Sequence, residues 1–197
     1  GFKILPNQLE SHINDNTKWL MLNSPSNPTG AVYSYDELKE LAEILLKYPK
    51  VLILSDDIYE KILYDNTEFY TIATVEPKLK NRTITMNGVS KAYCMTGWRL
   101  GWMIVPGDLL RSVECLTQNL FISPPTLSQF AGIKAFDCRH ELDGYVARYA
   151  KNRALLLEQL PKAGFETLAP ADGAFYIYAD ITGLTNDSQD FCRAMLA

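Results

Sequence analysis

The stretch "KWLMLNSPSNPTGAVYSYDELKELAEILLKYPKVLILSDD", Lys18 to Asp57, contains the alternation of strand and helix that decides the fold. Its two apolar runs, "KWLMLN" and "VLILS", are compact and resemble the buried strands of parallel sheets. Between them, "SYDE" is a capping box that opens a helix at Ser34. The sequence therefore predicts an α/β fold with a mostly parallel sheet flanked by helices. The predicted buried stripe of the helix contains Leu38, Leu41, Ala42, Leu45 and Tyr48.

Further elements continue this alternation. Near the start, "LPNQLESHI" predicts a short amphipathic helix with Pro6 in its first turn. "RTITMN" (residues 82–87) and "RLGWMIV" (residues 99–105) predict two more strands. Helical patterns then cover about residues 108–120, 125–137 and 141–160.

The pattern changes after Gly164. "FETLAP" is followed by a predicted strand, "AFYIYADI" (residues 174–181), and by a helix that opens near Asp187. We therefore expect residues 1–158 to form part of a large domain and residues 159–197 to begin a smaller α+β domain. Because the chain starts within a pattern and ends inside a predicted helix, we also expect it to be an internal piece of a longer protein.

The composition excludes several classes of function. The 197 residues are 47% hydrophobic and 21% charged, which is typical of a globular protein. A net charge of -4 argues against nucleic-acid binding, and no apolar run is long enough to cross a membrane. With two histidines and no CxxC pair, a metal site is not expected. The widely spaced cysteines predict reduced thiols and a cytoplasmic location; they are Cys94, Cys115, Cys138 and Cys192.

Polar residues follow two of the predicted strands at once. In "NSPSNPTG", Asn27 lies between prolines and either bonds the local backbone or aims its amide into a cleft. In "SDDIYEK", the acids form a solvated turn, begin a helix, or place Asp56 partly buried beside a cationic partner. Tyr59 lies three residues further on and reaches the same space as Asp56 if the segment curls. In open α/β sheets, ligands bind beyond these carboxyl ends.

The third strand end carries "NGVSKAYCMTGWRLG", residues 87–101. Lys91 is either a lysine whose stem packs while its amine reaches water, or a desolvated, nucleophilic amine suited to Schiff-base chemistry. Its apolar neighbours favour the second interpretation. Arg99, between glycines, is either a surface charge or a clamp for an anion. An amide, a carboxylate, a phenol, an amine and a guanidinium together suit the ring, aldehyde and phosphate of pyridoxal 5'-phosphate.

These motifs resemble the fold-type-I pyridoxal-phosphate aminotransferases of class I/II, and most closely the bacterial aspartate aminotransferases with an "MTGWRLG" signature. "NSPSNPTGAVYS", "SDDIYEKILYD", "NGVSKAYCMTGWRLG" and "DGAFYIYADI" occur in the order of that family and span the whole chain. The resemblance implies the fold of the large pyridoxal-phosphate-binding domain of these transferases.

The resemblance also implies a role for each residue. Lys91 matches the lysine that forms a Schiff base with the cofactor and then moves a proton between the substrate and the cofactor. Asp56 matches the acid that keeps the ring nitrogen protonated. Tyr59 and Asn27 match the donors to the ring oxygen, and Arg99 matches the phosphate-binding arginine.

Three further positions concern the same loop. Ser90 adds a phosphate contact by the same resemblance. The chain has Gly88 where the family often has serine, so one phosphate donor is expected to be absent. Cys94 replaces a small or aliphatic residue, and we interpret it as an inert, packed thiol.

The implied reaction transfers an amino group from an amino acid, aspartate in the closest resemblance, to a 2-oxo acid such as 2-oxoglutarate. The family implies a homodimer, and it places the phosphate loop and the substrate-carboxylate arginine outside this chain, so we expect the 197 residues alone to be inactive. Aromatic or prephenate aminotransferases and C–S lyases share Lys91, Asp56 and Arg99. An aminotransferase-like domain of a transcriptional regulator and a non-catalytic paralogue remain as alternatives; retention of all the site residues argues against the last.

Overall fold

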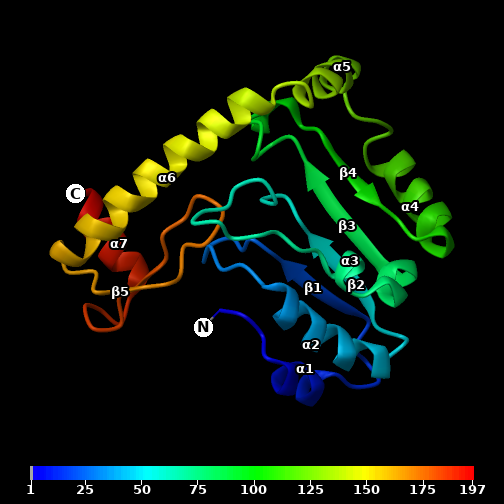
Figure 1. Ribbon diagram of the computed structural model, residues 1–197, viewed down its shortest axis with the longest axis horizontal. Helices are drawn as coiled ribbons and strands as arrows, with labels where there is room; N and C mark the ends of the chain where they lie inside the picture. Colours follow the sequence, from blue (N-terminus) through cyan, green and yellow to red (C-terminus); the bar gives the residue numbers. More distant parts are fainter. Residues whose placement is uncertain (1) are drawn as a thin grey trace.

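A four-stranded sheet forms the centre of the protein. The computed structural model describes residues 2–197, and its sheet has the order β1-β2-β3-β4 (Figure 1). The first three strands run parallel, and β4 pairs antiparallel with β3. This confirms the predicted α/β fold with a mostly parallel sheet. The bounds of the strands are β1 Trp19–Asn23, β2 Leu52–Asp56, β3 Thr83–Gly88 and β4 Gly101–Ile104.

One face of the sheet is covered by helices from the first half of the chain. These are α1 (Pro6–His12), α2 (Tyr35–Lys47), α3 (Ile72–Val75) and the 3-10 helix η1 (Pro77–Arg82). They enclose one hydrophobic core with β1 and β2, because their apolar stripes need a surface on which to be buried. The fully buried members of this core include Leu41, Leu45, Ile53, Ile72 and Leu79.

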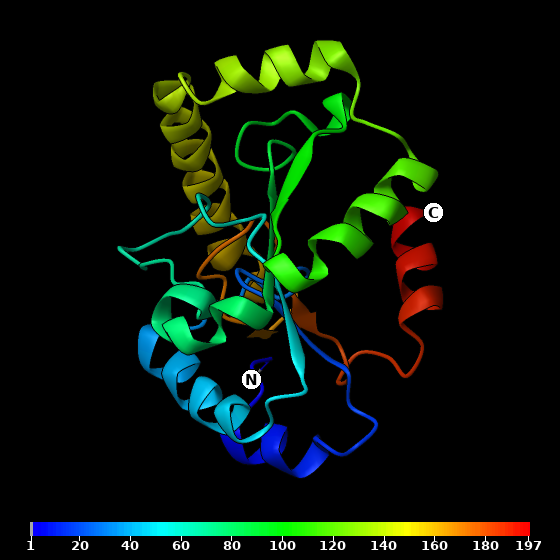
Figure 2. The same cartoon turned by 90° about the vertical axis from the view of Figure 1, so that its right-hand side faces the viewer.

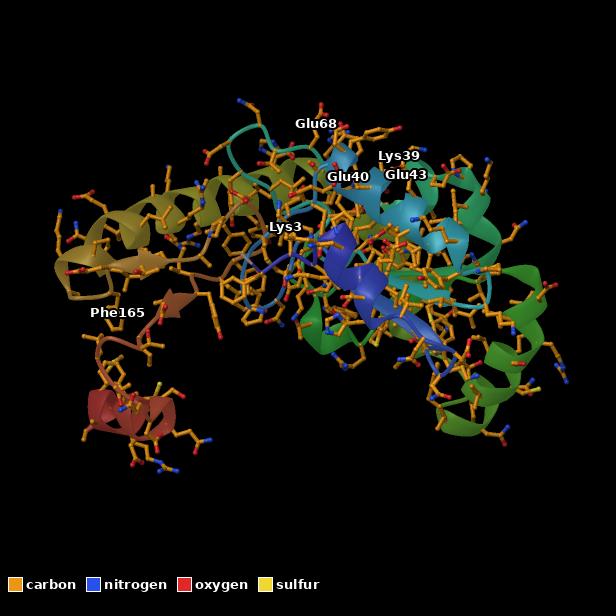
Figure 3. All side chains as sticks on the ribbon, turned by 90° about the horizontal axis from the view of Figure 1, so that it is seen from below. Lys3, Lys39, Glu40, Glu43, Glu68 and Phe165 are labelled. Carbon is orange, nitrogen blue, oxygen red and sulfur yellow. The ribbon has the colours of Figure 1, made fainter. Side chains whose placement is uncertain are left out.

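Helix α2 follows the sequence prediction closely. The Ser34 hydroxyl accepts from the Glu37 N–H at 3.3 Å, and the Ser34 N–H donates to the Glu37 carboxylate at 2.8 Å, so the capping box is present. The four aliphatic members of the predicted stripe are buried, whereas Tyr48 is half-buried at the C-cap. Charged residues lie on the solvent side of the helix, as Figure 3 shows for Lys39, Glu40 and Glu43.

Arg82 joins the end of α2 to the start of β3. Its guanidinium donates to the carbonyl oxygens of Leu45 at 2.6 Å and Tyr48 at 3.0 Å, and also to that of Val51. The last carbonyls of a helix have no partner within the helix, so a cationic donor there stabilises the C-terminus. These bonds fix the end of α2 and the residue before β2 relative to the start of β3.

The second half of the chain is more open. Helices α4 (Gly107–Leu120), α5 (Thr126–Ala135) and α6 (Arg139–Lys162) follow β4, and the predicted helical patterns there are confirmed. In Figure 2, α1 and α2 lie at one end of the molecule and α5 at the other. The hairpin of β5 (Thr167–Leu168) and β6 (Ala179–Asp180) and helix α7 (Ser188–Leu196) lie beside the far end of α6 (Figure 1).

Helix α6 runs without a break across residues 158 and 159, where the sequence predicts a change of domain. Part of the sheet is also uncovered by the described residues: Met21 of β1 is 71% exposed and Ile104 of β4 is 62% exposed.

The strand predicted for residues 174–181 is mostly wrong. Only Ala179 and Asp180 pair, because the preceding residues bond elsewhere. Ala174 has a left-handed φ of 56°, and its N–H donates to the Ile62 carbonyl at 2.9 Å. Gly173 likewise donates to the Gly30 carbonyl at 2.9 Å. These bonds hold residues 173 and 174 against the segments that follow β1 and β2, away from the β5–β6 hairpin.

Candidate active site

The carboxyl ends of β1, β2 and β3 border one open pocket of about 530 Å³. All six residues that the sequence predicts for the site line this pocket, although they come from positions 27 to 99. Parallel strands bring their carboxyl ends to the same edge of a sheet, which explains the convergence. The lining residues are Asn23, Asn27, Asp56, Ile58, Tyr59, Met86, Asn87, Ser90, Lys91, Thr96 and Arg99.

The loop after β1 is held by a side chain that the sequence analysis missed. Asn23 pairs with Asp56 in the sheet, and its side-chain amide donates to the Asp56 carbonyl at 3.2 Å. The Asn23 side-chain oxygen accepts from the N–H of Asn27 at 2.7 Å. Asn23 therefore fixes the backbone from which the exposed Asn27 side chain reaches the pocket. The sequence signal that could have identified Asn23 is its position as a polar residue at the end of an apolar strand.

Asp56 is the last residue of β2 and is half-buried. Burial raises the pKa of its carboxyl, and the hydrogen bond from the Ile58 N–H, at 3.3 Å, opposes that rise. None of the ion pairs among the described residues involves Asp56. A partly desolvated carboxylate of this kind favours a cationic partner, such as a protonated ring nitrogen.

Asp57 has a different environment from its neighbour. It is only 3% exposed, and its carboxylate accepts from the Ser55 hydroxyl at 2.7 Å. The Ser55 hydroxyl also lies 3.3 Å from that of Thr71. Burial raises the pKa of Asp57 to about 6. Of the two acids, only Asp56 lines the pocket, and the interpretation of Asp57 as part of a solvated turn is wrong.

Tyr59 contributes to one wall of the pocket, although almost all of its surface is buried by other residues. It is 1% exposed, and its ring contacts Phe175 edge to face at a centroid distance of 5.4 Å. Its hydroxyl lies 2.6 Å from the hydroxyl of Tyr176. Burial, with a further contribution from Tyr176, raises the pKa of Tyr59, so its phenol is a neutral hydrogen-bond donor.

The loop after β3 carries the amine and the guanidinium. Lys91 is half-buried, with its Nζ 5.9 Å from the centroid of the Tyr59 ring. The Thr96 hydroxyl donates to the Ser90 carbonyl at 2.9 Å, and Arg99 donates to the Thr96 carbonyl at 3.0 Å. Arg99 is exposed and has a left-handed φ of 52°. Thr96, which the sequence analysis did not select, therefore links the backbone of Ser90 to Arg99.

Gly88 is required by close packing of the backbone. It lies opposite Gly101 in the β3–β4 pair. A Cβ at position 88 would lie 3.0 Å from the Leu100 carbonyl oxygen and 3.1 Å from the Gly101 Cα, closer than ordinary contacts. A serine would therefore require this strand pair to shift.

Cys94 does not have the environment that the sequence predicts. The residue is exposed and has a left-handed φ of 54°, and its Sγ lies 3.3 Å from the hydroxyl of Tyr149 on α6. The prediction of a packed thiol in apolar surroundings is wrong, because the residue is exposed and its nearest polar contact is the Tyr149 hydroxyl.

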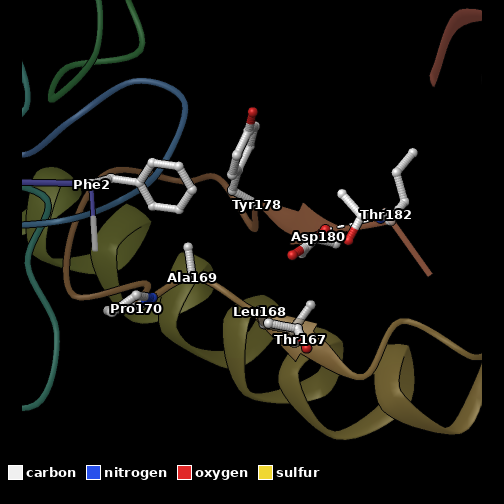
Figure 4. Close-up of a pocket in the computed structure, with 10 residues that line it drawn as sticks. Phe2, Thr167, Leu168, Ala169, Pro170, Tyr178, Asp180 and Thr182 are labelled. Carbon is white, nitrogen blue, oxygen red and sulfur yellow. Dashed lines mark hydrogen bonds between the residues drawn. The ribbon is translucent and has the colours of Figure 1, made fainter. Parts of the chain in front are cut away.

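A second pocket, of about 540 Å³, lies between the N-terminal segment and the β5–β6 hairpin (Figure 4). The rings of Phe2 and Tyr178 meet edge to face at 5.2 Å on one side of it. Asp180 is the one lining residue that is charged at neutral pH, and its carboxylate already accepts from the Thr182 N–H at 2.9 Å. This lining contains no lysine, arginine, histidine or cysteine, so the site at the strand ends is the better candidate.

Two other kinds of feature are absent from residues 2–197. No described helix has the length and apolar character needed to cross a membrane. Within the same range, no group of three or more His, Cys, Asp or Glu side chains is arranged to hold a metal ion.

Comparison with known proteins gives consistent matches. Residues 1–197 match the family described as "Aminotransferase class I and II". A Cereibacter sphaeroides protein named aspartate/prephenate aminotransferase is 44% identical over 184 residues, which are 93% of this chain and 46% of that protein. A Mycobacterium tuberculosis protein named valine–pyruvate aminotransferase is 41% identical over 192 residues, 96% of this chain and 48% of that protein.

Solved structures agree with this result. The aspartate aminotransferase from Rhizobium meliloti superimposes with a TM-score of 0.91 and 36% identity, covering 100% of this chain and 52% of that one. The aromatic aminotransferase from Pyrococcus horikoshii gives a TM-score of 0.91 and 34% identity, covering 99% of this chain and 52% of that one. The chain thus spans about half the length of the relatives it matches.

Proposed function

We propose, because this chain belongs to the class I and II aminotransferase family, that the complete protein containing it transfers an amino group from an amino acid to a 2-oxo acid with pyridoxal 5'-phosphate as cofactor. The observation that carries this proposal is the convergence of six polar side chains on one pocket at the carboxyl ends of three parallel strands. The second pocket does not offer comparable chemistry. Among residues 2–197, no group of His, Cys, Asp and Glu side chains is arranged to hold a metal ion.

The residues present fit pyridoxal phosphate. An acid with a raised pKa, a neutral phenol, an amide, an amine and a guanidinium line the same pocket, and they match the ring nitrogen, ring oxygen, aldehyde and phosphate of the cofactor. When bound, the cofactor supplies an electron sink for the electron pair left at the substrate Cα after its proton is removed.

Each residue then has a defined task. Lys91 would hold the cofactor at its aldehyde, and its free Nζ amine would take the proton from the substrate Cα as general base. Asp56 holds a proton on the ring nitrogen through an ion pair. Tyr59 and Asn27 donate to the ring oxygen, while Ser90 and Arg99 bind the phosphate.

Aspartate and 2-oxoglutarate are the proposed substrates. The relative named aspartate/prephenate aminotransferase supports aspartate as amino donor and keeps prephenate as an alternative acceptor. The relative named valine–pyruvate aminotransferase makes valine and pyruvate the competing pair.

The remaining proposals concern the whole protein. It is a homodimer whose large domain includes residues 1–158 and whose small domain begins at 159–197. The four cysteines are free in the described chain, which supports a reducing cytoplasmic location.

The decisive experiment uses the complete protein incubated with pyridoxal phosphate and then with borohydride, which reduces a carbon–nitrogen double bond and makes the attachment permanent. Mass spectrometry should find the added mass on the peptide that contains Lys91. Lys91→Ala should abolish the labelling and slow transfer from the amino donor by about 10²- to 10⁴-fold, the usual contribution of a general base. Lys61→Ala, at an exposed lysine outside the pocket, is the matched control and should behave as the parent does.

Labelling that persists in Lys91→Ala would contradict the assignment of the amine. A screen of aspartate, valine, phenylalanine and tyrosine as amino donors in the parent protein then decides between the proposed substrate pairs. Preference for aspartate over valine by less than tenfold would contradict aspartate as the main donor.

A further inference from the structure

We propose that Tyr176 is a positioning residue for Tyr59: its hydroxyl donates to the Tyr59 oxygen and so directs the Tyr59 O–H into the pocket. The inference rests on the proposed function, because the task of Tyr59 as donor to the ring oxygen belongs to that proposal. It adds a residue from the second half of the chain, which lines a different cavity from the other six.

The contact between the two phenols is short and part-buried. Their hydroxyl oxygens are 2.6 Å apart, although the residues are separated by 117 positions in the sequence. The Tyr59 side chain is 1% exposed. Tyr176 supplies the hydrogen-bond partner of the Tyr59 hydroxyl within the described chain.

The two phenols lie between two cavities. Tyr59 lines the pocket that contains Lys91 and Asp56. Tyr176 lines a neighbouring cavity of about 360 Å³, together with Tyr64, Tyr149 and Arg153. The hydrogen bond thus joins the wall of the active-site pocket to side chains that have no direct access to it.

The backbone just before Tyr176 is held by bonds to the segments that follow β1 and β2. The N–H groups of Gly173 and Ala174 donate to the carbonyls of Gly30 and Ile62, each at 2.9 Å. The Tyr64 hydroxyl donates to the Ala174 carbonyl. A Cβ on Gly173 would approach the Pro25 side chain to 2.7 Å, so this segment packs closely against the loop that carries Asn27. These anchors fix where the Tyr176 hydroxyl can lie.

The proposed direction of the hydrogen bond follows from the number of protons together with the task proposed for Tyr59. Each phenol has one O–H, and its oxygen also accepts. If Tyr59 donated to Tyr176, it would have no proton left for a ligand in the pocket. If Tyr176 donates, the Tyr59 proton is free to point toward the pocket, and its oxygen is still satisfied. The second arrangement is the one that lets Tyr59 bind an anionic oxygen.

The test is a double-mutant cycle in the complete protein, with Tyr59→Phe, Tyr176→Phe and both together. We expect Tyr176→Phe to weaken pyridoxal phosphate binding about 3- to 10-fold, as for the loss of one hydrogen bond. Tyr59→Phe should have at least that effect. The double variant should match Tyr59→Phe alone, because residues that act through one another are not additive. Tyr178→Phe, the same change two residues on at an exposed ring, is the matched control and should bind as the parent does.

A second measurement does not depend on the cofactor. With tyrosine labelled by ¹³C at the ring carbon that bears the hydroxyl, the Tyr59 resonance of the cofactor-free protein is identified by its absence in Tyr59→Phe. We expect Tyr176→Phe to move this resonance and Tyr178→Phe to leave it in place. A purely structural role for Tyr176 would instead lower the thermal midpoint of unfolding without non-additivity in binding.

Different results overturn different statements. An unmoved Tyr59 resonance in Tyr176→Phe, or additive losses in the double variant, would overturn the positioning role and leave the proposed function intact. A parent protein that binds no pyridoxal phosphate would overturn the proposed function, and the role of Tyr176 in cofactor binding with it. A moved resonance together with non-additive binding supports both.

Discussion

Helices α2 and α6 differ in how much they bury. Helix α2 has 13 residues and buries Leu38, Leu41, Ala42, Ile44 and Leu45, whereas α6 has 24 residues and buries only Leu142. Helices α4 and α7 have no buried residue in the described chain. An apolar stripe stabilises a helix only where a surface covers it. Stability should therefore concentrate in about the first half of the chain, within residues 2–99, which also contain the six predicted site residues.

The first half of the chain, whose helices pack against the sheet, is the packed half, and the largest expected effect is at its centre. Ile53 of β2 is fully buried in the core, so Ile53→Ala should lower the free energy of unfolding by about 2–5 kcal/mol. Leu116→Ala in α4, at a side chain that is 61% exposed, should change it by less than about 0.5 kcal/mol. Urea unfolding followed by circular dichroism measures both. Equal losses at the two positions would refute the division into packed and open halves.

The next effect concerns the pH dependence of the packed half. The pKa of Asp57 is raised by burial to about 6, from 3.8 without burial. Between these values the folded state keeps a proton that the unfolded state has lost, so stability falls as the pH rises from about 4 to 6. The loss is on the order of 2–3 kcal/mol, at about 1.4 kcal/mol for each pH unit that separates the two values.

Asp57→Asn should remove this part of the pH dependence, because the amide oxygen still accepts from Ser55 but does not ionise. The free energy of unfolding of the variant minus that of the parent should therefore be larger at pH 7 than at pH 4. The difference between the two unfolding curves isolates Asp57 from the other carboxylates. An unchanged slope would show that the unfolded and folded chains hold this proton equally.

Local patterns predicted the parts of the molecule that depend on neighbours in sequence. Asp56 was found because it directly follows an apolar strand, and Lys91 and Arg99 because they lie among small and apolar residues in the segment after the next strand. Strand ends meet at one edge of a parallel sheet, which brings these residues together. The capping box at Ser34 is also local. Ile53 and Ser55 lie on the same side of β2, and Asp57 continues this spacing directly after the strand. Because residues two apart share a face, this spacing would have indicated the burial of Asp57.

Other features depend on contacts that no local pattern contains. Tyr176 meets Tyr59 across 117 positions, and nothing in "AFYIY" indicates that partner. The same segment was predicted to be a strand because its apolar composition favours one, but its backbone bonds to Gly30 and Ile62 prevailed. Cys94 is exposed and has a left-handed backbone, and its residue type indicates neither.

Removal of a helix cap tests the packed half at lower amplitude. Ser34→Ala removes the acceptor for the Glu37 N–H and should cost about 1 kcal/mol of global stability, because α2 does not come away from the core without unfolding it. Native-state hydrogen exchange should show the loss at amides throughout the core. A loss confined to the first turn of α2 would mean that α2 opens independently of the sheet.

The same chemistry at α7 should have the smallest global effect. Asp187 accepts from the N–H groups of Gln189 and Asp190 at 2.9 and 3.0 Å, so Asp187→Ala removes a cap at least as well formed as that of α2. Global stability should nevertheless change by less than about 0.5 kcal/mol, because α7 buries no residue and unfolds locally. Hydrogen exchange should speed up in residues 188–196 alone. If instead the core amides respond as they do to Ser34→Ala, then α7 is coupled to the sheet, and packing in the described chain does not determine where stability lies.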